Sequence, residues 1–184
     1  MKSISIKGKR NTDKINSMNN PDAIHERTAI KRWSKEILEF YDSHDEQINV
    51  INKIYMDVKP LVNREIFIKE IVKKIDGYKR QDIEKKLYEP DKFIDMEEVL
   101  SKLTACRISC DYCKKNCYIL YNEVLSKTQW TIDRIDNDYG HNKDNIVIAC
   151  LDCNVRRGTM NSERFKLGKQ LKFIKKDSES DACS

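Results

Sequence analysis

Hydrophobic residues in the first part of the chain recur three and four positions apart, which is the spacing of one face of an α-helix. Five such stripes lie between residues 22 and 104; Pro60 and Pro90 close the second and fourth, and Gly77 closes the third. We therefore expect a mostly helical region over residues 21–104. The stripes cover residues 30–41, 48–58, 67–75, 83–87 and 96–103.

The pattern changes at Cys106. Two short runs of β-forming residues, CYILY (117–121) and NIVIAC (145–150), are separated by polar, turn-prone segments such as DNDYGHNKD. After Cys153 the helical spacing returns. The predicted fold class is therefore α+β, with a small unit over residues 105–176 that ends in a helix.

Composition narrows the class of protein. The 184 residues suffice for one ordinary domain, or for a small domain with a helical companion. With 39% hydrophobic and 35% charged residues, a core is expected beneath a densely charged surface. No apolar run approaches the roughly 18 residues of a membrane span, and residues 1–20 lack the apolar centre of a secretory signal. We expect an intracellular protein with no membrane partner.

The formal net charge of +5 is unevenly distributed. Residues 1–20 carry five Lys or Arg against one Asp, and are expected to form a basic, disordered tail. A basic segment favours a polyanionic partner such as nucleic acid. The alternative, that these lysines only solubilise the end of the chain, stays open.

Seven cysteines in a chain without a secretion signal favour metal ligands over disulfides. Two pairs have the spacing CxxC, namely CDYC (110–113) and CLDC (150–153). Such pairs match the tetrahedral coordination of zinc, and a closed site of four thiolates is structural rather than catalytic. We expect one zinc ion on Cys110, Cys113, Cys150 and Cys153. A pairing of Cys113 with Cys117 stays open, Cys106 is a rival ligand, and Cys183 is expected to bind nothing.

The stretch TIDRIDNDYGHNKDNIVIACLDCN (131–154) resembles the HNH, or His-Me finger, nuclease domains over roughly residues 105–160. The resemblance implies a ββα-metal finger with a zinc knuckle, and a metal-dependent endonuclease that hydrolyses the phosphodiester bonds of nucleic acid, double-stranded DNA in preference to RNA. By position, Asp133 and Asn154 match the ligands of a single Mg²⁺ or Mn²⁺ ion. Asn145 matches the asparagine that pins the loop and orients the catalytic residue. Oxygen ligands of this kind suit Mg²⁺.

Arg134 departs from the family pattern, because it stands where the family has the histidine that activates water. Arginine keeps its proton at any working pH, so it is not a general base, although it can clamp a phosphate. His141 is either a surrogate base or a solvated loop residue. Asp136 is either a second candidate base or a turn former.

Two hypotheses of function follow. The first is an HNH-type endonuclease in which another residue replaces the missing histidine. The second is a catalytically inactive, zinc-stabilised protein that binds nucleic-acid phosphates through Arg134, Arg156 and Arg157. A purely structural zinc module that mediates protein contacts is a further alternative within the second class.

Overall fold

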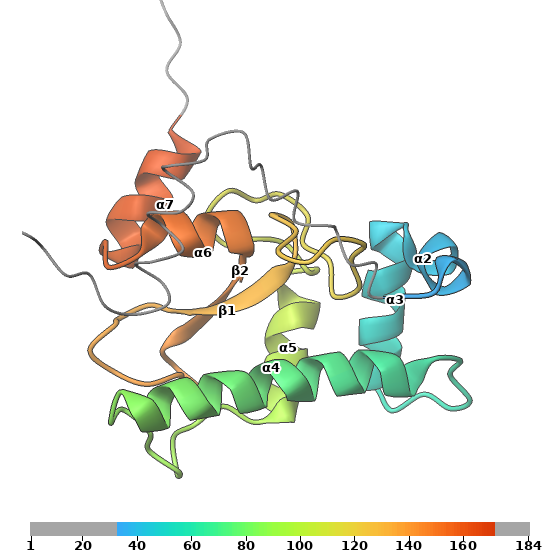
Figure 1. Cartoon of the computed structure of the whole chain (residues 1–184), viewed down its shortest axis with the longest axis horizontal. Helices are drawn as coiled ribbons and strands as arrows, with labels where there is room; N and C mark the ends of the chain where they lie inside the picture. The colour runs from blue at the N-terminus through green and yellow to red at the C-terminus, as the bar shows by residue number, and fades with distance from the viewer. Residues whose placement is uncertain (1–32, 172–184) are drawn as a thin grey trace, which may run out of the picture.

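The computed structural model describes residues 33–171. The predictions for the basic tail (1–20), for Ile30, for the end of the last helix (172–176) and for Cys183 lie outside these residues. Within them the chain is α+β, with a small two-stranded antiparallel sheet among helices (Figure 1). The elements are α2 (Lys35–Tyr41), α3 (His44–Tyr55), α4 (Arg64–Glu84), α5 (Met96–Ala105), β1 (Trp130–Arg134), β2 (Ile146–Cys150), α6 (Leu151–Arg157) and α7 (Ser162–Gln170).

Helices α3 and α5 pack against each other through the apolar stripes that the sequence predicted. Ile51 and Ile54 of α3 and Val99 and Leu103 of α5 are buried. Asp95 caps α5, because its carboxylate accepts a hydrogen bond from the backbone N–H of Glu98 at 2.8 Å. The core continues from these helices to Trp130 and Ile132 of the sheet and to the cysteines.

Helix α4 corrects one prediction. Gly77 was expected to end the third helix, but α4 runs through it to Glu84 and joins the third and fourth stripes. A glycine inside a helix costs only about 1 kcal/mol relative to alanine, so tertiary contacts can override it. Those contacts come from β1: the Nζ of Lys74 donates to the carbonyl of Trp130, and the hydroxyl of Tyr78 accepts from the N–H of Ile132 at 3.0 Å.

The end of α4 is fixed by its own backbone. Lys86 adopts the left-handed conformation (φ 60°), and the N–H of Leu87 donates to the carbonyl of Asp82 at 2.8 Å. The N–H of Lys86 also donates to the carbonyl of Ile83 at 3.1 Å, which completes a Schellman motif. The helix therefore stops within one turn of Asp82.

The sheet confirms one predicted strand and corrects the other. NIVIAC contains β2, which pairs with β1 in the register Trp130↔Cys150 to Arg134↔Ile146. The run 117–121 forms no strand and makes only an isolated bridge between Tyr118 and Gln129. After this bridge a side chain replaces a partner strand, because the Oε1 of Gln47 accepts from the N–H groups of Ile119 and Leu120.

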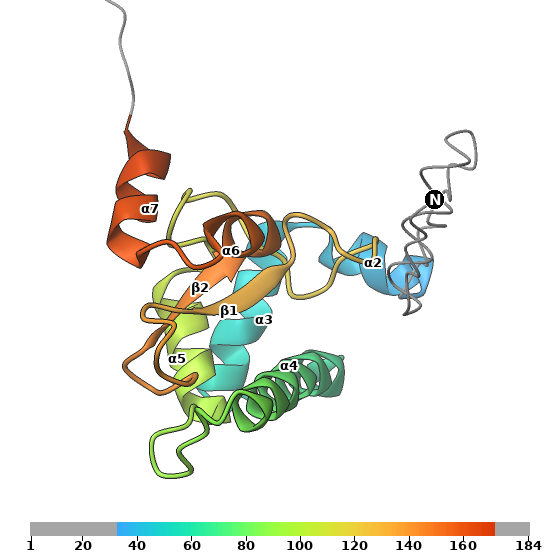
Figure 2. The ribbon, with the colours of Figure 1, turned by 60° about the vertical axis from the view of Figure 1, so that its left-hand side comes forward.

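Helix α6 begins directly after β2, so strand and helix meet at a sharp junction. The sheet lies between α6 and α7 on one side and α4 and α5 on the other (Figures 1 and 2). No helix within residues 33–171 has the length and apolar character required to cross a bilayer.

Candidate functional site: a cysteine cluster beside a polar cleft

Four sulfur atoms converge where the sheet meets α6. The ligand atoms of Cys110, Cys113, Cys150 and Cys153 all lie within 4.8 Å of one another, and those of Cys113 and Cys150 are 3.9 Å apart. Tetrahedral zinc with Zn–S bonds of about 2.3 Å places its sulfurs about 3.8 Å apart. The four thiols are therefore arranged so that they can hold a metal ion.

Local backbone structure explains the convergence. Lys114 adopts a left-handed conformation (φ 59°) that turns the chain back after Cys113, and the N–H of Cys110 donates to the carbonyl of Lys115 at 2.9 Å. Cys150 ends β2 and caps α6, because its sulfur accepts from the N–H of Cys153 at 3.4 Å. One pair thus sits on a turn and the other on the strand–helix junction.

The cluster favours at least one thiolate. The neighbouring thiol of Cys150 and nearby backbone N–H groups lower the pKa of the Cys110 thiol. Burial raises the pKa of Cys153 to about 12. A cation in the centre would stabilise all four thiolates at once, and thiolates are the form in which cysteine binds zinc.

The rival cysteines lie outside this cluster. The thiol of Cys106 donates to the carbonyl of Leu103 at 3.6 Å, and Cys117 is completely buried with its sulfur toward the carbonyl of Lys115. Burial raises the pKa of both thiols, which favours their neutral form. The four sulfurs that converge are therefore those of the two CxxC pairs. The alternative pairing of Cys113 with Cys117 is not formed.

Asp133 is buried in β1 and bound by other side chains. The guanidinium of Arg157 donates to both carboxylate oxygens, from Nε to Oδ2 at 2.6 Å and from Nη2 to Oδ1 at 2.8 Å. The hydroxyl of Tyr112 donates to Oδ2 at 2.7 Å. The structure therefore places Arg157, a predicted phosphate contact, inside the protein at 3% exposure as the partner of Asp133.

Asn145 pins the loop between the two strands, as the resemblance implied. Its Oδ1 accepts from the N–H of Asp136 at 2.9 Å, and its Nδ2 donates to the carbonyls of Asp136 and Gly140, both at 2.9 Å. Arg134 supports the same loop, because its Nη1 donates to the carbonyls of Asn137 and Tyr139. The side chain of Asp136 accepts from the N–H of Asp138 at 2.9 Å, which is the bond of a turn former.

His141 is not a solvated loop residue. It is only 4% exposed, and its Nδ1 lies 2.8 Å from Oδ1 of Asp82, whose Oδ2 accepts from the backbone N–H of His141 at 2.6 Å. The ring of Tyr78 stacks on the imidazole with centroids 4.5 Å apart. Burial lowers the pKa of His141 despite the nearby carboxylate of Asp82, so the imidazole is neutral at neutral pH.

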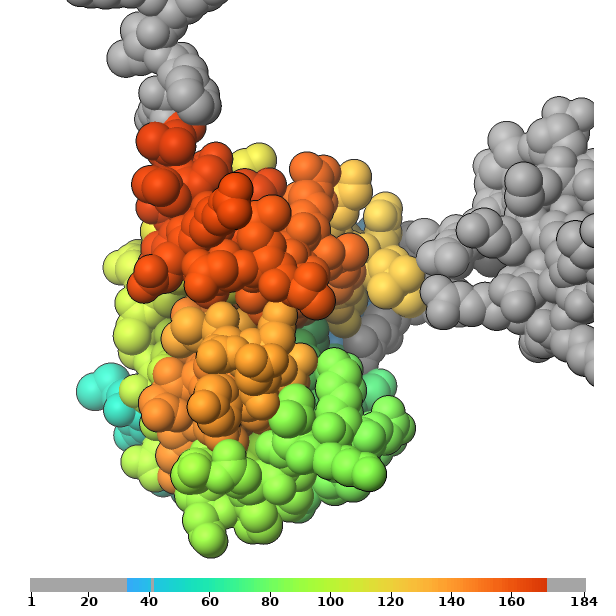
Figure 3. Space-filling model, turned by 90° about the vertical axis from the view of Figure 1, so that its left-hand side faces the viewer, coloured from blue at the N-terminus to red at the C-terminus, as the bar shows by residue number. Residues whose placement is uncertain are grey.

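Asp133, Arg134 and His141 line a polar cleft of about 360 Å³ between α4 and the β1–α6 unit. Figure 3 shows the loop that carries His141 between the end of α4 and the segment of α6 and α7. Asn154 reaches the cleft from α6, with its Nδ2 donating to Oγ1 of Thr131 at 3.1 Å. The lining residues include Tyr78, Gln81, Lys85, Thr131, Asp133, Arg134, His141, Asn154 and Val155.

Sequence reasoning missed the residues that α4 contributes. Asp82 lies 59 residues before His141, and only the docking of α4 on β1 brings the two together. Tyr78, Asp82 and Lys85 follow one another at steps of four and three, so helical periodicity alone places them on one face of α4. Nothing in the sequence identifies that face as the wall of a cleft.

Arg156 lies on α6 at the surface, where its Nε donates to Oδ1 of Asp152 at 2.9 Å. It is outside the residues that line the cleft. Comparison with family models, with curated proteins and with solved structures gave no match for this chain.

Proposed function

We propose that the protein is an HNH-like nuclease that hydrolyses phosphodiester bonds of nucleic acid in the cleft between α4 and β1. The observation that carries this proposal is the oriented histidine. Asp82 binds Nδ1 of His141, which leaves Nε2 to act as the base, and no described residue hydrogen-bonds Nε2. An imidazole held by a carboxylate and neutral at working pH is equipped as a general base.

Arg134 complements this base. Its Nη1 is anchored to loop carbonyls, while no described residue accepts from its Nε or Nη2. These donors suit a phosphate oxygen, as expected for a residue that clamps the scissile group. In the proposed reaction, His141 removes a proton from water as its oxygen attacks phosphorus; the ester P–O bond then breaks, and the leaving oxygen takes a proton from solvent.

The arrangement of sulfurs suits structural zinc, which we assign to Cys110, Cys113, Cys150 and Cys153 because sulfur donors at this separation match its coordination. Asp133 and Asn154, by contrast, do not form a site that fits a catalytic Mg²⁺ or Mn²⁺ ion. Arg157 holds both oxygens of Asp133, and a guanidinium in bidentate contact repels a divalent cation. We therefore assign no reaction step to such an ion.

The second candidate function is a catalytically inactive protein that binds nucleic acid. The ion pair between Asp133 and Arg157 favours it, because this pair occupies the carboxylate that the resemblance assigns to the catalytic metal. Both candidates predict nucleic-acid binding, but only the first predicts cutting.

Incubation of the purified full-length protein with supercoiled plasmid separates the two candidates. The nuclease proposal predicts nicked and linear products, and repeating the incubation with Mg²⁺, with Mn²⁺ and with chelator shows whether an added ion is needed. Intact plasmid under every condition, together with measurable binding of the same plasmid, would establish the inactive binder instead.

A further inference from the structure

Helix α4 contributes to the cleft a cation that forms no ion pair with a described residue. Lys74 and Tyr78 dock α4 on the backbone of β1, and Lys85 lies about two turns beyond Tyr78 on the same side. Unlike Lys74 and Tyr78, Lys85 does not bond to the backbone of β1. Its side chain is exposed and lines the cleft.

Lys85 has no ion-pair partner among the acidic side chains of residues 33–171. Several exposed lysines within residues 33–171 form ion pairs, such as Lys92 with Glu89 and Lys143 with Asp95, whereas Lys85 forms none with any described carboxylate. The only carboxylate among the cleft-lining residues, Asp133, is already paired with Arg157. Lys85 from α4 and Arg134 from β1 are therefore cleft-lining cations that form no ion pair with a described carboxylate, while the carboxylate of Asp82 is bonded to His141.

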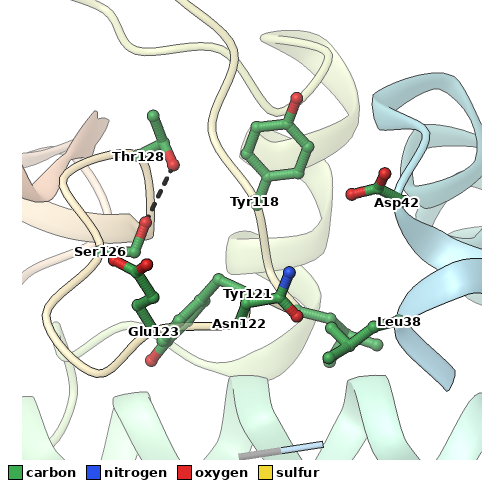
Figure 4. Close-up of a pocket in the computed structure, with 9 residues that line it drawn as sticks. Leu38, Asp42, Tyr118, Tyr121, Asn122, Glu123, Ser126 and Thr128 are labelled. Atoms are coloured by element: carbon green, nitrogen blue, oxygen red, sulfur yellow. Dashed lines mark hydrogen bonds between the residues drawn. The ribbon is translucent and has the colours of Figure 1, made fainter. Parts of the chain in front are cut away.

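The charge of a second cavity has the opposite sign. This cavity, of about 260 Å³, lies beside α2 and is lined by Asp42 and Glu123 together with Tyr118, Ser126 and Thr128 (Figure 4). Neither carboxylate forms an ion pair with a described residue, so this surface repels phosphate. A polyanion is thus favoured at the cleft and disfavoured beside α2.

We propose that Lys85 is a substrate-binding residue whose ammonium group contacts a phosphate of the nucleic-acid strand lying in the cleft. This inference rests on the proposed function of the cleft. On this proposal the substrate is bound by the helical part of the chain as well as by the stretch 131–154. A phosphate between Lys85 and Arg134 would bring the backbone of the strand alongside His141.

Lys86 is a matched control. It is the next residue, it is also exposed, and it lies at the same end of α4, but it is not among the residues that line the cleft. Any effect of general charge, or of a cation near the C-terminus of a helix, is therefore shared by both lysines. The two positions differ in backbone conformation, φ −84° at Lys85 and φ 60° at Lys86, and in their position relative to the cleft.

Fluorescence anisotropy of a labelled oligonucleotide, titrated over a range of salt without added divalent metal, tests the proposal with the wild type, Lys85→Ala, Lys85→Arg and Lys86→Ala. One lost phosphate contact should make the slope of log K against log salt shallower by about 1, and weaken binding to all sequences alike. We expect this change for Lys85→Ala, recovery in Lys85→Arg, and wild-type behaviour in Lys86→Ala.

Equal slopes for Lys85→Ala and Lys86→Ala, or a wild type that binds no oligonucleotide, would overturn the inference. Because binding is measured without cleavage, the proposed nuclease activity is tested separately. A protein that binds through Lys85 but never cuts plasmid would retain the inference and refute the nuclease.

Discussion

At the scale of single residues, the site depends on how two buried charged side chains are paired. Asp133 and Arg157 are 7% and 1% exposed at their side chains and form a bidentate ion pair. Tyr112 adds a third donor. Removal of one partner from such a pair leaves the other buried and uncompensated, which is the costly case for buried charge.

Asp133→Asn should therefore lower the free energy of unfolding by about 3–5 kcal/mol, because Arg157 loses its anionic partner. Urea unfolding monitored by circular dichroism measures this change. Asp144→Asn, at an exposed position in the same loop, should stay within about 0.5 kcal/mol of the wild type. Equal stability of Asp133→Asn and the wild type would show that Asp133 is free to serve another ligand.

The buried imidazole of His141 predicts a pH dependence of stability. Burial holds its pKa below the ordinary value of 6.5, so between the two values the unfolded chain binds more protons than the folded one. The stabilising contribution of the neutral ring is thus complete above about pH 6.5 and is lost as pH falls toward the folded pKa.

We expect the free energy of unfolding, measured above about pH 6.5 and below the folded pKa of His141, to decrease on acidification. The decrease should be larger in the wild type than in His141→Gln. A wild type that instead gains stability on acidification, relative to the variant, would mean that Asp82 and protonated His141 form a favourable ion pair.

Sequence reasoning found part of this residue-level picture. The CxxC spacing identified four cysteines that converge, because metal ligands on tight turns have a fixed separation along the chain. Asn145 was placed correctly as the residue that pins the loop. The partners Asp82 of His141 and Arg157 of Asp133 were missed, because pairing across the fold leaves no periodic signal.

At the scale of elements, the junction between the end of α4 and the loop carrying His141 positions the candidate base. Gly140 approaches α4 closely: a Cβ at this position would lie 2.4 Å from the carbonyl oxygen of Leu87 and 2.9 Å from Oδ2 of Asp82. Because backbone cannot move aside as a flexible side chain does, only glycine fits here. The loop therefore docks on the last turn of α4.

Gly140→Ala should destabilise the protein by about 1–3 kcal/mol through overpacking at this junction. Gly77→Ala, inside α4 with no atom within 4 Å of the added Cβ, should instead stabilise it by roughly 0.5–1 kcal/mol. Thermal unfolding of the two variants gives the signs. Two shifts in the same direction would contradict the close approach of the loop to α4.

The elements also show why periodicity predicted helices better than strands. The stripes of α3 and α5 are buried for the most part where the spacing placed them, since each helix satisfies its own backbone, although Tyr55 and Val58 at the end of the second stripe are exposed. The run 117–121 has the composition of a strand, but a strand needs a partner, and at Ile119 and Leu120 the side chain of Gln47 takes the place of one. The prediction that Gly77 ends the helix was wrong, because the contacts of α4 with β1 outweigh the weak preference of glycine against helix.

At the scale of the whole molecule, the cysteine cluster ties turn, strand and helix together beside a core that continues into α3 and α5. If the cluster holds zinc, one zinc ion per chain should copurify, and Cys150→Ser should lose it and unfold. Structural zinc contributes on the order of 10 kcal/mol to the folding of small modules.

Elemental analysis and near-ultraviolet circular dichroism measure these two outcomes. Cys106→Ser serves as the control, since Cys106 lies outside the cluster and its variant should keep both metal and fold. A preparation without metal that remains folded would show that the four thiols do not depend on an ion.

The most direct test of the proposed function is plasmid cleavage by His141→Ala, with oligonucleotide binding measured in parallel. The account predicts that cleavage falls by about 10²–10⁴-fold while binding is unchanged, because the base acts on water and not on substrate affinity. His44→Ala, which removes the other histidine among residues 33–171, should cut like the wild type, since His44 bonds the carbonyl of Ile108 and does not line the cleft. Cleavage by His141→Ala at the wild-type rate would contradict the assignment of His141 as the base.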